Sequence, residues 1–529
     1  MTKEFTKKLD RTPRTLLYLC LFLGAFFPGI VYFKDDPLVA QWFISIFVTL
    51  IIALYETYRA TYKKDDVLSI EISIGQAATI VVACECIYAI LCSLLLDRSV
   101  QGTMNSSTGL ALYISLLLPF VLRNSVFAKG VEKAKVLSVV VIAIITIFAT
   151  ECRTSMLCTV LIIMVAIEFR FRVPIKARFI SATIVVILLA FFIFSGYKGG
   201  STNGRWFILK NSIELIAEKP LKGYSETGGF RKVYMEKQAE YFKQNSEDGY
   251  AMLADDIKHP LNEYMYIAIN YGVHTLLSVV AAVVALITML YRRHTKESLC
   301  TLHFMALLVI WSCFSYPFTV SFVPVMLLAF LPTLPGVEQF RYKSHLRYPA
   351  FLLLLLYAGV ELRAFNDERE WNNAIEEYRN GNKNVAMQVF DRWEELHIDK
   401  GAMLFSLATV EYNNKDYHKC IEACIKCSNH LASYDLEFLL ANSYLFTGNY
   451  TNALEHFETA HNMCPNRFVP LYKQFKIYKA QGDTVRMIST GNEILAKRVK
   501  VPSRKIDIIL NNVRYELQKI SNNDESSCQ

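Results

Sequence analysis

A polar stretch begins Ser201-Thr202-Asn203-Gly204-Arg205-Trp206 and ends His259-Pro260-Leu261-Asn262-Glu263, within a chain that is otherwise apolar over its first two thirds. With its flanking residues it spans 197–262, and apolar runs of membrane-spanning length lie on both sides. Loops between transmembrane helices are usually short, so a loop of this length predicts a functional role. The stretch therefore organises the fold, with membrane helices before and after it.

The apolar runs predict an all-α, polytopic membrane domain over residues 1–363. About 20 apolar residues in a helix can cross a hydrocarbon core of roughly 30 Å. We predict eleven such helices, or twelve if the boundaries are drawn differently. The first run lacks a small-residue cleavage site, which favours a retained helix over a signal peptide. The predicted spans are about 14–33, 38–57, 76–97, 108–126, 134–151, 154–170, 178–196, 264–290, 299–316, 320–338 and 346–363.

Basic residues fall on one side of these helices. The net charge is +8, and Lys and Arg gather in every second connection between the predicted helices. The four short connections on the opposite side hold only Lys34, Arg98 and Arg153. This follows the positive-inside rule, so the charge is a topology signal and not a sign of nucleic-acid binding. It predicts a cytoplasmic N-terminus, with the loop and the C-terminal part outside the cytoplasm, which in a bacterial chain is the periplasm. An extra or missed helix after the loop would move only the C-terminal part.

Residues 364–529 are polar and predict a soluble helical-repeat domain. Turn-like residues recur there every 33 or 34 residues, a period that resembles the tetratricopeptide repeat over roughly 370–500. Stacked units of this kind form an α-solenoid. Its role is either docking of a protein partner or acceptor, or a structural cap on the membrane domain. The recurring turn residues are Gly381, Lys415, Gly448 and Gly482.

Thirteen cysteines raise the question of metal sites and disulfides. Cys424 and Cys427 have no second Cys or His pair at zinc spacing, which favours packing in the core over a metal site. A disulfide there remains open.

Arg153 is the first candidate for chemistry. It lies in Glu151-Cys152-Arg153-Thr154-Ser155, between two apolar runs joined by almost no loop. A cation at bilayer depth costs about 2.5–3.5 kcal/mol on insertion scales and usually lines a polar cavity. This favours a functional role, and the alternative is an arginine whose long side chain reaches the interface.

Arg205 is the second candidate, because it precedes an amphipathic pattern that ends at Pro220. The pattern predicts a helix that lies along the membrane surface, in contact with lipid. We expect Arg205 in its first turn, where free backbone N–H groups and the guanidinium fork suit a phosphate. A plain surface arginine is the alternative. The apolar face consists of Trp206, Leu209, Ile213 and Ile216.

His259 is the third candidate, just before the next membrane helix and followed by Asn262 and Glu263. An imidazole can accept a proton near neutral pH, which is typically worth 10²–10⁴-fold in rate. The alternative is a loop histidine beside a helix start that Asn262 caps. Further along the loop, Arg231, Lys232 and Lys237 predict a solvated helix face, and Asp255 with Asp256 is only weak evidence for a divalent ion.

The order of these residues resembles the O-antigen ligase / polymerase superfamily of bacterial membrane glycosyltransferases, over roughly 75–320. The resemblance is carried by the Arg153 hairpin, by Gly204-Arg205 and a helix ending Pro220-x-x-Gly223, and by His259 with Asn262 before the next helix. The chain departs from the family where Cys152 replaces the usual serine, Tyr224 follows Gly223, and Leu261 precedes Asn262.

The resemblance implies transfer of a glycan from undecaprenyl pyrophosphate to a periplasmic acceptor, either lipid A-core or a protein hydroxyl. It implies no cofactor, nucleotide sugar or required metal. Carried over by position, Arg153 and Arg205 bind the pyrophosphate, and His259 activates the acceptor hydroxyl or assists the leaving group. Asn262 and Glu263 are supporting residues.

Two other functions stay open. A sibling polymerase would lengthen glycan chains, but polymerases more often carry two substantial outside loops, whereas this chain has one. A non-catalytic membrane anchor that presents the repeats belongs to a different class. A transporter is disfavoured because intramembrane charge is sparse and no inverted repeat is visible.

Overall fold

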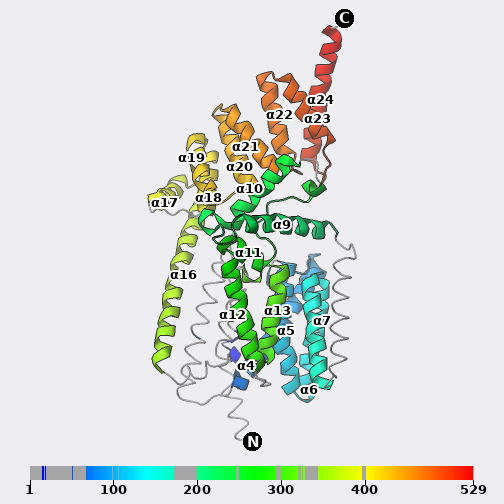
Figure 1. Cartoon of the computed structure of the whole chain (residues 1–529), viewed down its shortest axis with the longest axis vertical. Coiled ribbons are helices and arrows are strands. Elements are labelled where there is room, and N and C mark those ends of the chain that lie inside the picture. Colours follow the sequence, from blue (N-terminus) through cyan, green and yellow to red (C-terminus); the bar gives the residue numbers. More distant parts are fainter. Residues whose placement is uncertain are drawn as a thin grey trace. The chain divides into compact units, whose positions relative to one another are not determined.

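The computed structural model describes residues 67–171, 199–292, 299–319 and 344–527, apart from gaps at 98, 105, 246–248 and 396–400. It also describes Thr15, Leu16, Tyr18, Leu19, Ile51, Val323, Met326 and Leu327. Across these residues the chain forms helices and turns without a strand, which confirms the all-α prediction (Figure 1). The predicted spans at 14–33, 38–57, 178–196 and 320–338 lie wholly or mostly outside the described residues, so the count of eleven stays a prediction.

The chain divides into two compact units. The membrane unit comprises residues 1–197, 261–263 and 278–373, and the loop–repeat unit comprises 198–260, 264–277 and 374–529. The long polar loop thus belongs to the same unit as the C-terminal repeats. The sequence placed a domain boundary between residues 363 and 364, which lies inside helix α16 (Ser344–Arg379).

The membrane unit contains three helices that are long and apolar enough to cross a membrane, at Ile72–Leu96, Ser107–Ser125 and Val273–Arg292. Shorter apolar stretches occupy Arg153–Met164 and Cys300–Phe314. The helices of this unit are α4 (Val67–Leu96), α5 (Ser107–Phe127), α6 (Gly130–Ala149), α7 (Arg153–Phe171), α13 (Leu299–Phe314) and most of α12 (Val273–Arg292) and α16, with 3-10 turns η1 (Gly102–Met104) and η4 (Pro317–Thr319).

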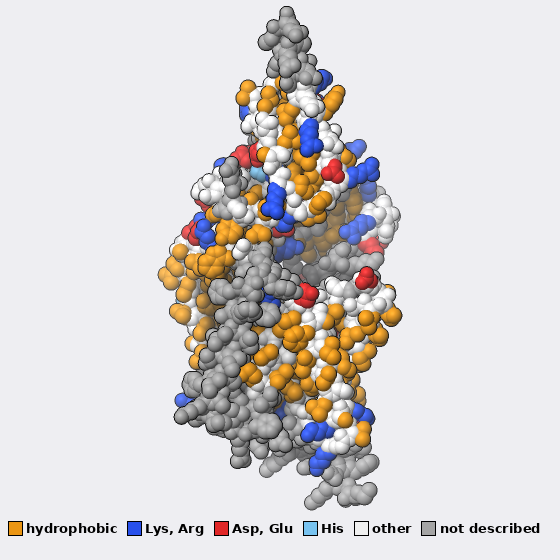
Figure 2. Space-filling model, turned by 90° about the vertical axis from the view of Figure 1, so that its right-hand side faces the viewer, with side chains coloured by type: hydrophobic (Ala, Val, Ile, Leu, Met, Phe, Trp, Pro, Cys, Tyr) orange, Lys and Arg blue, Asp and Glu red, His pale blue; other side chains and the backbone are white. Residues whose placement is uncertain are grey.

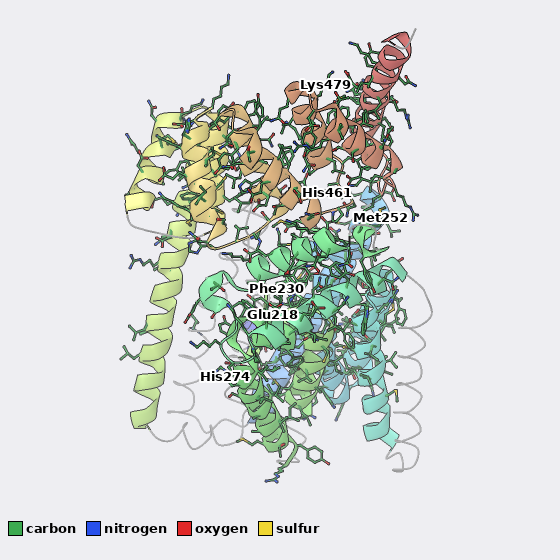
Figure 3. All side chains as sticks on the ribbon, turned by 45° about the horizontal axis from the view of Figure 1, so that its top comes forward. Glu218, Phe230, Met252, His274, His461 and Lys479 are labelled. Carbon is green, nitrogen blue, oxygen red and sulfur yellow. The ribbon has the colours of Figure 1, made fainter. Side chains whose placement is uncertain are left out.

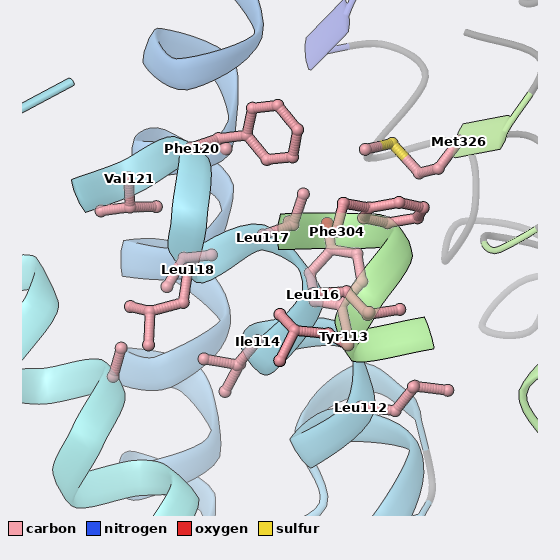
Figure 4. Close-up of a cluster of buried hydrophobic side chains, with 14 of the residues drawn as sticks. Leu112, Tyr113, Ile114, Leu116, Leu117, Leu118, Phe120, Val121, Phe304 and Met326 are labelled. Atoms are coloured by element: carbon pink, nitrogen blue, oxygen red, sulfur yellow. The ribbon is translucent and has the colours of Figure 1, made fainter. Parts of the chain in front are cut away.

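Helix α5 forms the centre of this unit. Its residues between Leu110 and Val121 are buried all round, as expected for a helix that packs on α4, α6, α7 and α13. Figure 4 shows this cluster, in which Leu116 and Leu117 lie near Phe304 of α13. Polar bonds also join α5 and α13. The Trp311 Nε1 donates to the Ser115 Oγ at 3.0 Å, and the Cys300 thiol donates to the Pro119 carbonyl at 3.6 Å.

Helix α6 leaves an apolar stripe uncovered. Leu137, Val141, Ile145 and Phe148 follow one another at spacings of three or four, and each is exposed. Hydrophobic side chains gather on the face of the molecule seen in Figure 2. An apolar stripe of this kind suits contact with lipid acyl chains, in agreement with a membrane-embedded unit.

The loop–repeat unit starts with α9 (Gly199–Glu218) and α10 (Gly229–Gln244), which pack on each other. Figure 3 marks them by Glu218, at the end of α9, and Phe230, at the start of α10. Two 3-10 turns, η2 (Ser225–Thr227) and η3 (Gly249–Met252), precede and follow α10. Helix α11 (Glu263–Tyr271) then leads into α12.

The apolar run predicted as one helix over 264–290 is divided, which corrects that prediction. Helix α11 ends at Tyr271, α12 begins at Val273, and Gly272 between them has a φ of +84°. The sequence predicted one helix because apolar residues continue on both sides of Gly272.

The repeats consist of antiparallel helix pairs stacked in chain order (Figure 1). Left-handed turn residues recur at the predicted positions, with φ of +95° at Gly381, +64° at Lys415, +79° at Gly448 and +74° at Gly482. The next residue caps the following helix in three units, where Asp416, Asn449 and Asp483 accept bonds from the backbone N–H three residues on. The helices are α17 (Lys383–Glu395), α18 (Gly401–Asn413), α19 (Tyr417–Ser428), α20 (Tyr434–Phe446), α21 (Tyr450–Met463), α22 (Val469–Gln481), α23 (Thr484–Ala496) and α24 (Arg504–Ser527).

The cysteines of α19 pack in the core of this solenoid, as the sequence favoured. Cys424 and Cys427 are both buried and free, and the Cys427 thiol donates to the Gly401 carbonyl at 3.1 Å.

Candidate functional site

The hairpin that carries Arg153 has the predicted form. Helix α6 ends at Ala149 and α7 begins at Arg153, so only three residues connect them. Glu151 has a φ of +53°, which lets the chain reverse tightly, and the Cys152 carbonyl accepts bonds from the Met156 N–H and the Ser155 hydroxyl. Arg153 is half-buried at the first position of α7. A guanidinium at a helix start adds its charge to that of the free N–H groups, which suits an anion.

Arg205 does not occupy the first turn of its helix, which corrects the sequence prediction. Helix α9 begins at Gly199, because residues 199–204 continue the helix upstream despite their glycines. The backbone N–H groups beside Arg205 are therefore inside the helix and unavailable to an anion. Its side chain is exposed, so any anion would be bound by the guanidinium alone.

The two faces of α9 have different surroundings. Phe207, Asn211 and Leu215 are buried, and the Phe207 ring contacts the rings of Tyr241, Phe242 and Tyr250 at centroid distances of 5.0 to 5.3 Å. Trp206 and Ile213, on the predicted apolar face, are 60% and 51% exposed. Within its own unit the predicted membrane-facing side of α9 is thus uncovered.

A cation holds α9 and α10 together. Lys237 Nζ of α10 lies 2.8 Å from Glu218 Oε1 and 3.7 Å from Glu214 Oε2, both on α9. The hydrogen bond from Lys237 lowers the pKa of Glu218, and the same bond raises the pKa of Lys237. The Tyr224 hydroxyl also donates to Glu218, at 3.0 Å. The prediction of a solvated lysine face is wrong at Lys237, since this side chain lies between carboxylates.

The Pro220-x-x-Gly223 motif attaches the loop to the break between α11 and α12. The break frees backbone groups that a continuous helix would satisfy. The Val273 N–H donates to the Pro220 carbonyl at 2.7 Å, and the Tyr224 N–H donates to the carbonyls of Ile269 and Asn270 at 2.8 and 3.1 Å. Gly223 has a φ of +66° and lies so close to the Asn270 carbonyl that a Cβ would clash. The motif therefore has a structural explanation.

His259 lies within a small aromatic cluster. Its ring stacks on Tyr266 of α11, with centroids 4.7 Å apart and planes at 16°, and it lies 6.5 Å from the ring of Phe230 on α10. Phe230 stacks in turn on Tyr234 at 5.0 Å. Stacking on Tyr266 covers one face of the imidazole, and the His259 Nε2 is buried.

Asn262 and Glu263 belong to the membrane unit and bond to other residues of that unit. The Asn262 Nδ2 donates to the Cys313 carbonyl at 3.0 Å, and Glu263 Oε1 accepts from the Phe318 N–H at 3.1 Å. Glu263 is buried. These contacts give both residues a structural role at the entry to α11.

Arg153 belongs to the membrane unit, whereas Arg205 and His259 belong to the loop–repeat unit. Sequence reasoning missed Tyr266, which stacks on His259, and Asn270, whose Oδ1 accepts from the Phe230 N–H at 2.9 Å. Both lie in an apolar run that was assigned to the bilayer. The Gly272 that interrupts this run was the available signal.

The two units together define a membrane-embedded, all-helical protein with a folded polar loop attached to helical repeats. Residues 138–280 match the model of a family described as O-Antigen ligase, which confirms the resemblance found in the sequence. The matched segment runs from α6 into α12 and includes the Arg153 hairpin and the whole loop. This segment of the chain is therefore similar to the O-antigen ligase family.

Other comparisons add little. No curated protein matches the chain. Among solved structures, "Crystal structure of APC/C hetero-tetramer Cut9-Hcn1" aligns at 13% identity, covers 91% of this chain and 85% of that chain, and has a TM-score of 0.22. A similarity at that TM-score does not establish a common fold.

Proposed function

We propose that the protein transfers a glycan from undecaprenyl pyrophosphate, in the bacterial inner membrane, to a periplasmic acceptor that is either lipid A-core or a protein hydroxyl. The match of residues 138–280 to the O-antigen ligase family carries this proposal, because that segment contains Arg153, Arg205 and His259. The uncovered apolar faces of α6 and α9 support it, since a lipid-linked donor must reach the site from the bilayer.

In this mechanism Arg153 and Arg205 bind the pyrophosphate. The bond between the sugar anomeric carbon and the pyrophosphate oxygen breaks, and negative charge grows on the leaving group. Two guanidinium groups stabilise that charge, and charge-assisted hydrogen bonds are worth about 1.5–3 kcal/mol each. Undecaprenyl pyrophosphate leaves as the anion and needs no added metal for neutralisation.

His259 takes the proton of the acceptor hydroxyl as its oxygen forms the new bond to the anomeric carbon. Stacking on Tyr266 fixes the plane of the imidazole. A positioned general base of this kind contributes typically 10²–10⁴-fold. We expect His259→Gln to lower transfer by that order. His274→Gln serves as the matched control, because His274 is exposed at the start of α12.

The experiment supplies the purified full-length protein with an undecaprenyl-pyrophosphate glycan and separates lipid-linked from acceptor-linked products. A ligase forms acceptor-linked glycan only when acceptor is present. A polymerase, the alternative within the family, instead lengthens the lipid-linked glycan without any acceptor. Absence of both products, with the donor intact, would leave the non-catalytic anchor as the better account.

A further inference from the structure

We infer that the C-terminal repeats act on the loop of their own chain: the turns between successive repeats hold α10 and residues 254–256, and so position His259. The part of this inference that concerns catalysis rests on the proposed function. The part that concerns position stands on contacts within the loop–repeat unit. Asn466 and Arg467 are then positioning residues, which act through the segment before His259.

The first set of contacts joins α10 to the repeats. Gln238 is fully buried, and its Nε2 donates to the Met463 carbonyl at the end of α21, at 2.6 Å. At the start of α10, Lys232 Nζ donates to the Asn429 carbonyl at 3.4 Å. Gly228, with a φ of +90°, lies so near the His430 carbonyl that an added Cβ would be 2.8 Å from it. Two inter-repeat turns thus contact the same loop helix.

The second set holds the segment that leads to His259. The Asn466 side chain donates to the Ala254 carbonyl, and Arg467 Nη2 lies 3.0 Å from Asp255 Oδ1. The Asp255 carbonyl accepts from the Gln238 Nε2 at 3.0 Å. Ala254 itself is buried between Phe207 and Phe242, so the segment is held from both sides.

Arg467 is itself fixed by the repeats. Its guanidinium lies 4.0 Å above the ring of Tyr434, and its Nη1 is 3.8 Å from Asp435 Oδ1. An arginine that stacks and pairs in this way loses little additional side-chain freedom when it binds a further carboxylate. Its contact with Asp255 therefore fixes a segment relative to the repeats, and this segment lies only four residues before His259.

This arrangement explains why a repeat domain accompanies the ligase domain. Segment 254–260 follows the single turn of η3 and has no helix of its own, so its course depends on outside contacts. An error of about 1 Å in the position of a catalytic group can cost 10²-fold in rate. The inter-repeat turns at 429–430 and 463–467 are consequently an internal interface, and an acceptor protein would have to use another surface of the repeats.

Hydrogen–deuterium exchange on the full-length protein in nanodiscs tests the inference directly. In the double variant Asn466→Ala/Arg467→Ala, we expect exchange at residues 250–259 to accelerate about tenfold or more, with exchange in α22 and α23 unchanged. Arg486→Ala is the matched control, because Arg486 also lies over a tyrosine, 5.2 Å from the Tyr478 ring, and pairs with Asp483 at 2.6 Å. It touches no loop residue among these contacts, and its variant should leave 250–259 as in the wild type.

Kinetics on the same samples test the catalytic part. We expect the double variant to lower kcat about tenfold or more, while KM for the lipid-linked donor changes less than twofold. Unchanged exchange at 250–259 overturns the inference, and faster exchange with unchanged kcat overturns the positioning of His259. If the wild-type protein transfers no glycan, the proposed function is wrong. Hydrogen–deuterium exchange at residues 250–259 then tests by itself whether the repeats hold the loop.

Discussion

Gly272 is a single residue on which the attachment of the loop depends. Its φ of +84° is costly for any residue with a Cβ, and an added Cβ would collide with the Leu221 carbonyl. Gly448 has a similar φ of +79°, but open space surrounds it. Substitution of Gly448 therefore measures the cost of backbone strain alone, whereas substitution of Gly272 adds the cost of the close contact with the loop.

We predict that Gly448→Ala costs about 1–2 kcal/mol of stability, from the left-handed backbone alone. Gly272→Ala should cost a further 1–3 kcal/mol, because the Leu221 carbonyl has to move. Thermal unfolding of both variants in detergent measures the difference. Equal losses for the two variants would mean that segment 220–224 does not depend on the break before α12.

The buried side chain of His461 should make the stability of the repeat domain sensitive to acid. Burial, with Lys497 adding to it, lowers the pKa of His461 to about 3, well below the ordinary 6.5. Glu493 Oε1 lies 3.5 Å from the His461 Nε2, and burial raises the pKa of Glu493. Between pH 6.5 and 3 the unfolded chain thus binds a proton that the folded chain does not.

Stability of α21–α23 should therefore fall as the pH drops below 6.5, by up to about 1.4 kcal/mol per pH unit. His461→Gln should flatten this dependence, whereas His418→Gln, at an exposed position on α19, should leave it unchanged. Exchange protection of α21 measured across this pH range is the readout. A wild-type protection that stays constant between pH 6.5 and 4 would refute the prediction.

At the residue scale, the sequence predicted those features that are determined by residues close together along the chain. The Arg153 hairpin follows from two apolar runs with almost no residues between them. The contact of Arg467 with Asp255 joins residues that are 212 apart, and no local pattern indicates it. Arg205 was misplaced because the glycines before it were read as a break, although α9 continues through them.

At the element scale, α9 is amphipathic in an unusual way. The hydrophobic pattern of the sequence marks Trp206, Leu209 and Ile213, yet this is the side that its own unit leaves uncovered. The packed side contains Asn211 and Ser212, both fully buried, beside Phe207. An apolar helix side that the protein does not cover is typical of contact with a membrane surface.

We predict that the Trp206 side of α9 contacts lipid. A photoreactive p-benzoylphenylalanine at Trp206 should crosslink to phospholipid when the protein is in liposomes. The same group at Val485, an exposed apolar position on α23 that is 80% exposed, should not. Crosslinking of both sites to the same extent, or of neither, would contradict the prediction.

The repeats were the part of the fold that the sequence predicted best. Their period appears in the turn residues, and those residues have the left-handed backbone that the period requires. The division of the run at 264–290 was not predicted, because Gly272 is one residue in a continuous apolar stretch. The union of loop and repeats in one unit could not be predicted either, since it depends on side chains such as Gln238 that look solvated in the sequence.

At the scale of the whole molecule, the distribution of basic residues fixes the expected topology. The 197–262 loop is predicted outside the cytoplasm, and the 291–298 connection inside. In intact cells, Ser246→Cys should react with a membrane-impermeant maleimide, and Ser298→Cys should react only after the membrane is permeabilised. Labelling of Ser246→Cys only from the cytoplasm would contradict the topology and, with it, the proposed function.

The central claim concerns the pair of arginines and the lipid pyrophosphate. In a transfer assay with an undecaprenyl-pyrophosphate glycan, we predict that Arg153→Ala and Arg205→Ala each lower kcat/KM by about 10²-fold, as loss of roughly 2.7 kcal/mol requires. Lys210→Ala, on the same helix as Arg205, should change it less than about threefold. Transfer at the wild-type rate in both arginine variants would contradict the account.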